Sequence, residues 1–119
     1  MSYRVKITDT AMQDLREIAL WIAEQAKDKE IAKRFVNELR EECKKLNTFP
    51  NSGSLPKDRI LKSLGYRFIV HKDYLIFYLT DDEKMMALGN KVDVKAVMTG
   101  ENGAERVKKY SVPMGGGMV

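Results

Sequence analysis

The sequence predicts a two-layer α+β domain with an N-terminal strand, an antiparallel helical hairpin, and a three-stranded antiparallel meander that completes one sheet. Three patterns lead to this class. Polar and apolar residues alternate over residues 3–7, two apolar stripes at helical spacing occupy residues 11–46, and three runs of strand-forming residues occupy residues 66–98. A chain of 119 residues is expected to form one domain, which we place at residues 1–110, with a Gly-rich flexible tail at 111–119.

The first strand and the helical hairpin follow from periodicity and capping residues. One side of the strand is apolar and consists of Tyr3, Val5 and Ile7. Thr8, Asp9 and Thr10 all offer N-cap oxygens, and Thr10 with Gln13 has capping-box spacing, so we expect the first helix to begin at this segment. Its apolar stripe consists of Ala11, Leu15, Ile18, Ala19 and Ile22. Trp21 flanks this stripe and is expected to be partly buried. Asp28 is expected to cap a second helix, whose stripe consists of Ala32, Phe35, Leu39, Cys43 and Leu46.

The meander is predicted from three segments after a loop that begins at Pro50. Residues 66–70 and 74–79 are rich in aromatic and β-branched residues and indicate a hairpin across a polar turn at 71–73. Alternation over residues 92–98 predicts the last strand.

Apolar residues fall on both faces of this predicted sheet. One face includes Phe68, Ile76 and Val94. The opposite face carries Ile69, Leu75, Phe77 and Val97. Because the helical hairpin covers only one face, we expect another chain to cover the second set.

Few catalytic routes are compatible with the residues present. The single histidine, His71, falls in the predicted turn and is interpreted as a solvated residue, whereas the single cysteine, Cys43, is interpreted as a small buried hydrophobe. Phosphate-binding glycine loops and zinc motifs are absent from the sequence, so no cofactor and no metal are expected. No apolar run approaches the roughly 18 residues that span a bilayer, and the N-terminus lacks a signal-peptide core, so we expect a cytoplasmic protein with no membrane partner.

The positive charge is concentrated in one part of the chain. The formal net charge is +4, and residues 49–78 alone carry five Lys and Arg against two Asp, a net +3. Cations beside aromatic residues could hold phosphates or stabilise phosphodiester cleavage, but such residues also form the ordinary solvent face of strands. The group consists of Arg59, Lys62, Arg67, Lys72, Tyr74, Tyr78 and Lys95. The position of the excess charge favours an acidic protein partner.

The order and spacing of several segments are similar to those of a known family. They are Tyr-Arg-Val-Lys-Ile-Thr at 3–8, Ala-Met-Gln-Asp-Leu-Arg-Glu-Ile at 11–18, Leu-Asn-Thr-Phe-Pro-Asn-Ser-Gly at 46–53, Gly-Tyr-Arg at 65–67 and Tyr-Leu-Ile-Phe-Tyr at 74–78. Over about residues 3–80 the chain resembles the RelE/ParE superfamily of bacterial toxins, the toxic halves of type II toxin-antitoxin or plasmid-stabilisation modules. The resemblance implies a growth-inhibiting toxin that a small, acidic cognate antitoxin neutralises by wrapping an extended or helical segment across it. It also implies an oligomeric state that depends on the antitoxin.

The branches of this superfamily differ in their target. Members that cleave messenger RNA on the ribosome tend to carry an arginine early in the third strand, where this chain has Leu75. They also tend to carry arginine or histidine at the end of the fourth strand, where residues 96–103 of this chain have no positive charge. A ribonuclease of this type would have to rely on Arg67, Tyr78 and Lys95. Segment 74–78 is more like the ParE branch, which poisons DNA gyrase without hydrolytic residues, so a non-enzymatic ParE-like toxin is the leading hypothesis.

Two alternatives stay open at this stage. One is the ribosome-dependent ribonuclease. The other is a degenerate toxin that only binds its antitoxin, because Thr-Gly-Glu-Asn-Gly at 99–103 replaces the basic segment common in the ParE branch, and residues 83–91 resemble an insertion.

Overall fold

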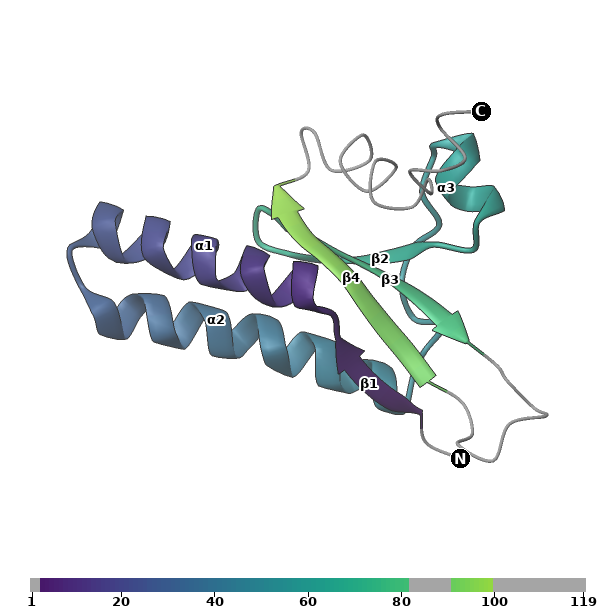
Figure 1. Ribbon diagram of the computed structural model, residues 1–119, viewed down its shortest axis with the longest axis horizontal. Helices are drawn as coiled ribbons and strands as arrows, with labels where there is room; N and C mark the ends of the chain where they lie inside the picture. Colours follow the sequence, from purple (N-terminus) through teal and green to yellow (C-terminus); the bar gives the residue numbers. More distant parts are fainter. Residues whose placement is uncertain (1–2, 82–90, 100–119) are drawn as a thin grey trace.

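The computed structural model describes residues 3–81 and 91–99, which form a helical hairpin packed on one face of a four-stranded sheet (Figure 1). The elements are β1 (Arg4–Ile7), α1 (Asp9–Ala26), α2 (Lys29–Lys44), the 3-10 turn η1 (Lys45–Asn47), α3 (Arg59–Ser63), β2 (Arg67–His71), β3 (Tyr74–Asp81) and β4 (Lys91–Thr99). The strand order is β1-β4-β3-β2, with β1 parallel to β4 and the other neighbours antiparallel. The predicted two-layer α+β class with its antiparallel meander is confirmed. Residues 83–90 of the predicted insertion and the predicted tail at 111–119 lie outside the described residues.

Helix α1 begins two residues earlier than the capping-box spacing predicts. Thr8 is the N-cap, with extended backbone, and its Oγ1 accepts a hydrogen bond from the Ala11 N–H at 3.3 Å. The same hydroxyl donates to the Val94 carbonyl on β4 at 2.8 Å, and the Thr8 N–H also donates to that carbonyl at 3.0 Å. Thr8 is therefore the one of the three predicted candidate caps that is used, and contacts with a strand more than 80 residues away hold it in the capping conformation.

The turn between the helices and the cap of α2 agree with the sequence prediction. Lys27 adopts the left-handed conformation (φ 54°) that ends α1, and Asp28 then accepts a hydrogen bond from the Glu30 N–H at 2.9 Å. The α-helical part of the second helix stops at Lys44 and continues for three residues as η1. This 3-10 turn still carries Leu46 into the core, where it is fully buried.

The main core lies between the helical hairpin and the sheet. Its buried members are Ala11, Leu15, Ile18, Leu39, Cys43, Leu46, Ile76, Tyr78, Val94 and Val97. Fully burying a leucine or isoleucine side chain stabilises a fold by about 1.5–3 kcal/mol, so these residues hold the two layers together. Trp21 was predicted to be partly buried, but its side chain is 58% exposed. The end of the hairpin near the α1–α2 turn projects beyond the sheet, so the sheet does not cover this part of α1 (Figure 1).

A short helix, α3, covers the second face of the sheet and was missed in the sequence. The Asp58 side chain caps it by accepting hydrogen bonds from the N–H groups of Ile60 and Leu61 at 2.9 and 3.1 Å. Leu61 is fully buried in a second cluster with Tyr66, Phe77 and Ala96. Five helical residues are too few to show a helical period, so residue patterning does not reveal this helix.

The register of the first hairpin differs from the prediction by one residue. The turn contains two residues, Lys72 (φ 55°) and Asp73, and not three, so His71 pairs with Tyr74 as part of β2. Ile69 consequently lies opposite Ile76 on the helix-facing side, and Phe68 lies opposite Phe77 on the second face. A shift of one residue moves every side chain of a strand to the other face. The prediction for Ile69 was therefore wrong, and those for Leu75 and Phe77 are confirmed as to the face they occupy.

A β-bulge at Lys95 changes the face of the residues that follow it in β4. Val94 pairs with Tyr78 and Ala96 pairs with Phe77, so Lys95 is an extra residue in the ladder. Val94 and Val97 both pack toward the helices, whereas Ala96 packs on the second face. The strict alternation assumed for this strand placed Val97 on the second face, and the bulge makes that placement wrong.

Candidate functional site

Two of the three residues predicted for ribonuclease chemistry meet at one loop. Arg67 and Tyr78 are cross-strand partners on β2 and β3. The Tyr78 hydroxyl accepts a hydrogen bond from the Gly53 N–H at 3.0 Å and donates to the Pro50 carbonyl at 2.7 Å. The Arg67 guanidinium donates to the Gly53 carbonyl at 3.0 Å. Both side chains therefore fasten the loop at 50–53 to the sheet.

The loop approaches the sheet so closely that only glycine fits at position 53. A Cβ atom there would lie 2.6 Å from the Tyr78 hydroxyl oxygen and 2.8 Å from the Phe68 carbonyl oxygen. The next residue, Ser54, makes two backbone hydrogen bonds with Phe68, which extend the edge of β2 by one bridge. The Tyr78 ring is fully buried in this arrangement, and burial raises the pKa of its hydroxyl above the ordinary value, so the group stays neutral at physiological pH.

Lys95, the third predicted residue, stands apart from this pair. It is the bulged residue of β4, and α1 fixes the backbone on either side of it. The Thr8 hydroxyl contacts the carbonyls of Val94 and Lys95 at 2.8 and 3.4 Å, and the buried carboxylate of Asp14 accepts a hydrogen bond from the Val97 N–H at 3.0 Å. Within residues 3–81 and 91–99, no hydrogen bond or ion pair joins the Lys95 side chain to Arg67 or Tyr78.

The sheet face expected to bind another chain is partly closed by the chain itself. Of the four predicted residues, only Leu75 and Phe77 lie on the second face, and Phe77 is buried against Leu61 and Tyr66. Val70, which lies opposite Leu75 on this face, remains 57% exposed. Three apolar side chains of α3 and its flanks are also about half exposed, namely Leu55, Ile60 and Leu64. Exposed cations lie among them, namely Lys57, Arg59 and Lys62, and none of the three forms an ion pair within the described part of the chain.

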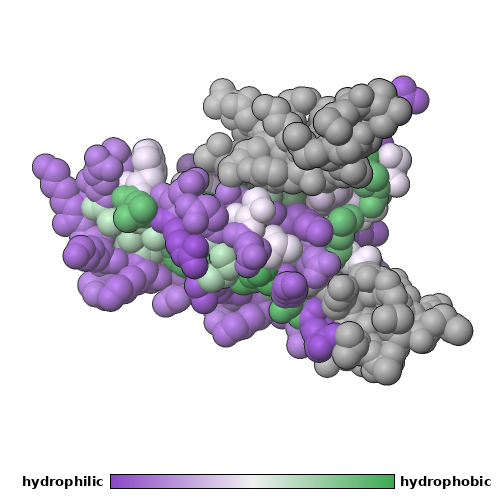
Figure 2. All heavy atoms as spheres, in the orientation of Figure 1, coloured by the Kyte–Doolittle hydropathy of each residue, from purple (hydrophilic) through white to green (hydrophobic). Residues whose placement is uncertain are grey.

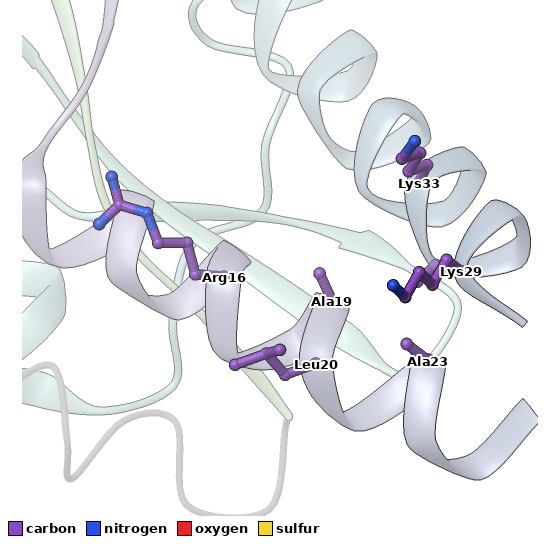
Figure 3. Close-up of a pocket in the computed structure, with 7 residues that line it drawn as sticks. Arg16, Ala19, Leu20, Ala23, Lys29 and Lys33 are labelled. Atoms are coloured by element: carbon purple, nitrogen blue, oxygen red, sulfur yellow. The ribbon is translucent and has the colours of Figure 1, made fainter. Parts of the chain in front are cut away.

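A groove of about 440 Å³ runs between α1 and α2 (Figure 3). Its apolar lining consists of Ala19, Leu20, Ala23 and Ala32. Three cations also line it, Arg16 on α1 and Lys29 and Lys33 on α2. In the view of Figure 2, the apolar surface on the projecting part of the hairpin is bordered by hydrophilic side chains. This groove was not predicted from the sequence, because Ala19 and Ala32 lie on the expected core stripes. The cations spaced around these alanines, Arg16, Lys29 and Lys33, could have indicated it.

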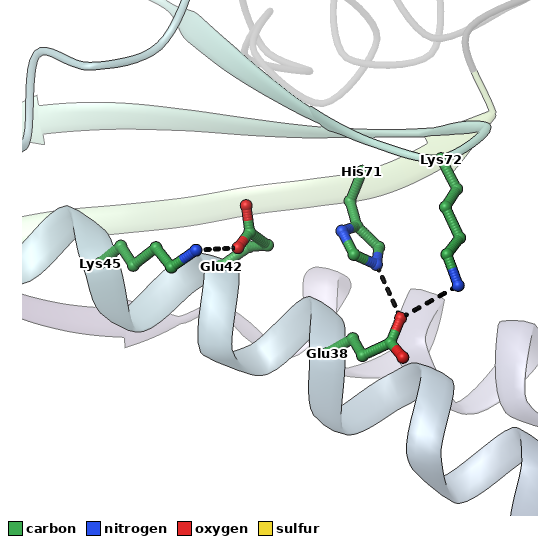
Figure 4. Close-up of polar contacts among 5 residues, drawn as sticks. All are labelled: Glu38, Glu42, Lys45, His71 and Lys72. Atoms are coloured by element: carbon green, nitrogen blue, oxygen red, sulfur yellow. Dashed lines mark hydrogen bonds and ion pairs between the residues drawn. The ribbon is translucent and has the colours of Figure 1, made fainter.

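A polar cluster joins the β2–β3 turn to α2 (Figure 4). One oxygen of Glu38 contacts His71 Nε2 at 2.9 Å and Lys72 Nζ at 3.2 Å. The hydrogen bond from His71, followed by that from Lys72, holds the pKa of the Glu38 carboxyl below its ordinary value. Phe35 lies beside the cluster, with its ring centroid 5.7 Å from that of His71. The interpretation of His71 as a solvated turn residue was wrong, because the shorter turn places it in β2 above α2.

Metal and membrane sites find no support in the described residues. Among residues 3–81 and 91–99, no three His, Cys, Asp or Glu side chains are grouped so that they could hold a metal ion. No helix in the same ranges is long and apolar enough to cross a bilayer. Cys43 is buried as predicted, and burial raises the pKa of its thiol to about 12. At neutral pH this thiol is almost entirely protonated and a poor nucleophile.

Comparisons with known proteins agree with this geometry. A family model described as the ParE toxin of the type II toxin-antitoxin system parDE matches residues 5–88. The structure is similar to a chain of the chromosomal ParDE toxin-antitoxin system from P. aeruginosa, with a TM-score of 0.66 and 18% identity over 84% of this chain and 98% of that one. It is also similar to a chain of the toxin-antitoxin complex RelBE2 from Mycobacterium tuberculosis, with a TM-score of 0.59 and 20% identity over 83% of this chain and 99% of that one. No curated protein matches the chain significantly.

Proposed function

This chain belongs to the ParE toxin family of type II toxin-antitoxin systems, and from that premise we propose that it inhibits bacterial growth by binding and poisoning DNA gyrase. We further propose that a small acidic antitoxin neutralises it. In this proposal the toxin acts by occupying a surface of its target and not by hydrolysing a bond. The superfamily resemblance of segment 74–78 to the gyrase-directed branch motivates the choice of target.

The observation that carries the proposal is the structural use of Arg67 and Tyr78. Cleavage of a phosphodiester requires a proton acceptor or donor and cations near the scissile phosphate. The Tyr78 hydroxyl is buried, has a raised pKa, and uses its proton on the Pro50 carbonyl. The Arg67 guanidinium is partly buried and bound to Gly53, and Leu75 stands where the nuclease branch carries an arginine. These contacts support a toxin that binds its target without cutting it.

The distribution of charge supports an acidic partner. Lys57, Arg59 and Lys62 are exposed beside half-exposed leucine and isoleucine side chains, and a second group of cations lines the groove between α1 and α2. An antitoxin with acidic residues flanking apolar ones would match both surfaces, and charge complementarity would also speed its association.

Ribosome-dependent cleavage of messenger RNA is the second candidate function. The observation in its favour is that Arg67 and Tyr78, two of its three candidate residues, do meet as a cross-strand pair. It requires the loop at 50–53 to release both side chains before they can reach a phosphate.

Controlled expression of the chain in bacteria without an antitoxin separates these functions. The proposal predicts growth arrest with induction of the DNA-damage response, intact transcripts, and inhibition of supercoiling by purified gyrase mixed with the purified chain. Transcripts cut during ribosome passage, with no DNA damage, would support the ribonuclease and contradict the proposal. Unimpaired growth would contradict both and support a chain that only binds its antitoxin.

A pair of arginine variants sharpens the same experiment. Arg67→Ala should retain growth inhibition if the arginine only holds Gly53, provided that circular dichroism shows the variant to be folded. Arg34→Ala is the matched control, because Arg34 is an exposed arginine on α2 that belongs to none of the candidate sites. Loss of toxicity in a folded Arg67→Ala protein, with Arg34→Ala still toxic, would favour the ribonuclease.

A further inference from the structure

We propose that α3 and its flanks form the surface with which this chain binds its target, and that the target presents to it an acidic protein surface with apolar residues at its centre. The residues of this α3 surface are Leu55, Lys57, Arg59, Ile60, Lys62 and Leu64. This inference rests on the proposed function, in which the target is gyrase, and adds which side chains make the contact. Because the proposed acidic antitoxin matches the same side chains, it would compete with the target for them.

Helix α3 is fixed to the sheet at both of its ends, so a partner meets a preformed surface. Leu61 is fully buried against the second face of the sheet, in the cluster that contains Phe77. At the start of the helix, the Asp58 carboxylate accepts hydrogen bonds from the N–H groups of Ile60 and Leu61 at 2.9 and 3.1 Å. At its end, the Tyr66 N–H donates to the Leu61 carbonyl at 3.1 Å. A surface that is already ordered loses little conformational entropy when a partner binds.

The apolar part of the α3 surface consists of three aliphatic side chains that remain about half exposed, Leu55, Ile60 and Leu64. Ile60 and Leu64 are four residues apart, so they lie on the same side of the helical turn. Leu55 directly follows Ser54, whose backbone pairs with Phe68 at the edge of β2. Aliphatic side chains that stay exposed in one short segment of a folded chain are typical of an interaction surface.

The charges of the α3 surface select an acidic partner. Lys57, Arg59 and Lys62 are exposed, and none of them forms an ion pair within residues 3–81 and 91–99. The one carboxylate of segment 55–64 belongs to Asp58, whose side chain caps the helix. Carboxylates of a partner would supply the missing counter-charges, and their attraction would also speed association.

The mixture of cations and aliphatic side chains favours a protein over a nucleic acid. Interfaces with DNA are polar, and most of their hydrogen bonds go to phosphate and sugar oxygens. Ile60 and Leu64 would gain little from phosphates, whereas apolar residues of an acidic protein surface would bury them. An apolar centre with a polar rim is the usual arrangement of a protein–protein interface.

Inhibition of supercoiling by purified gyrase, measured with the full chain and its variants, tests the α3 surface. Lys57→Glu combined with Lys62→Glu should raise the concentration of chain that gives half-inhibition at least about tenfold, because two attractions become repulsions. Ile60→Ser should raise this concentration at least about threefold, because it removes apolar area from the contact.

Matched controls lie on α2, across the sheet from α3 (Figure 1). Arg34→Glu combined with Arg40→Glu reverses two exposed cations outside the α3 surface. Ile31→Ser truncates an isoleucine that is 42% exposed, compared with 52% for Ile60. Each control should change the concentration for half-inhibition less than about twofold, and circular dichroism should show every variant to be folded.

Direct binding of the labelled full chain identifies the partner. Fluorescence anisotropy should show binding to gyrase without DNA, and both α3 variants should weaken it. Binding to duplex DNA alone that the lysine variant weakens and Ile60→Ser does not would make α3 a nucleic-acid surface and overturn the inference.

The same experiments separate this inference from the proposed function. A parent chain that inhibits gyrase, with α3 variants that inhibit it equally, would contradict the α3 surface alone. A parent chain that leaves gyrase fully active would contradict the proposed function, and with it the target assigned to this surface.

Discussion

Replacing Tyr78 by phenylalanine should lower the free energy of unfolding by about 2–4 kcal/mol, although it removes a single oxygen atom. The hydroxyl makes two hydrogen bonds, from the Gly53 N–H at 3.0 Å and to the Pro50 carbonyl at 2.7 Å. Leaving a buried N–H without a partner costs about 1–3 kcal/mol, and losing the second bond costs about 0.5–1.5 kcal/mol. No water can easily replace the oxygen, because Tyr78 is fully buried and Gly53 is buried beside it.

Urea and thermal unfolding followed by circular dichroism at 222 nm would measure the effect. For a chain of this size, a loss of about 2 kcal/mol corresponds to a decrease in Tm of roughly 8–10 °C. Tyr74→Phe is the matched control, since Tyr74 lies on the same strand and its hydroxyl makes no hydrogen bond within the described residues. The control should change stability by less than about 0.5 kcal/mol.

The comparison of the two tyrosines decides the role of Tyr78. Equal stability changes in Tyr78→Phe and Tyr74→Phe would refute the conclusion that the Tyr78 hydroxyl fastens the loop. If Tyr78→Phe is destabilised as expected but still arrests growth at a temperature where it is folded, the hydroxyl is structural and takes no part in catalysis.

Three further predictions concern other buried or paired groups. Asp14→Ala should reduce the free energy of unfolding by about 1–3 kcal/mol, because it leaves the buried Val97 N–H unpaired. Asp14→Asn keeps an acceptor and should reduce the free energy of unfolding by less. Equal losses of the two variants in urea unfolding would contradict this role of Asp14. Cys43, with a pKa of about 12, should resist a thiol reagent at pH 8 until urea is added, and rapid labelling of the folded chain would show that the thiol is accessible. Glu38→Gln should be less stable than the parent at pH 7. Folding lowers the pKa of Glu38, so the stability that this carboxylate contributes is fully present above its ordinary pKa of 4.5 and is lost as the pH falls through the lower folded value. The difference in stability between the variant and the parent should therefore shrink in acid. A difference that stays constant from pH 7 to pH 2 would show that ionised Glu38 does not bind His71.

Local patterns in the sequence were sufficient for much of this fold. Two helices with apolar stripes, a cap at Asp28, a buried Cys43 and three strand-forming runs all appear in the structure near their predicted positions. These features depend on residues within one or two turns of each other, so periodicity and capping chemistry report them directly. The family resemblance likewise depended on the order of such local segments, and the family model confirms it over residues 5–88.

The candidate site was harder to predict from the sequence, because it depends on which face of the sheet each strand residue occupies. A turn of two residues at Lys72 and Asp73 moved Ile69 to the helix side, and the bulge at Lys95 did the same for Val97. Residue types in a strand do not specify the turn length to one residue, yet a one-residue error exchanges the two faces.

The roles of the remaining site residues were decided only in the tertiary structure. From the sequence, Tyr78 and Arg67 were candidates for catalysis, and only the approach of Gly53 from a distant loop shows that their polar groups are bound in the fold. The groove between α1 and α2 and the covering of Phe77 by α3 also arise only where separate elements pack together. By itself, the sequence determined the elements and the family, because short-range chemistry determines both. Which side chains face a partner, and which serve the fold, was decided by long-range packing.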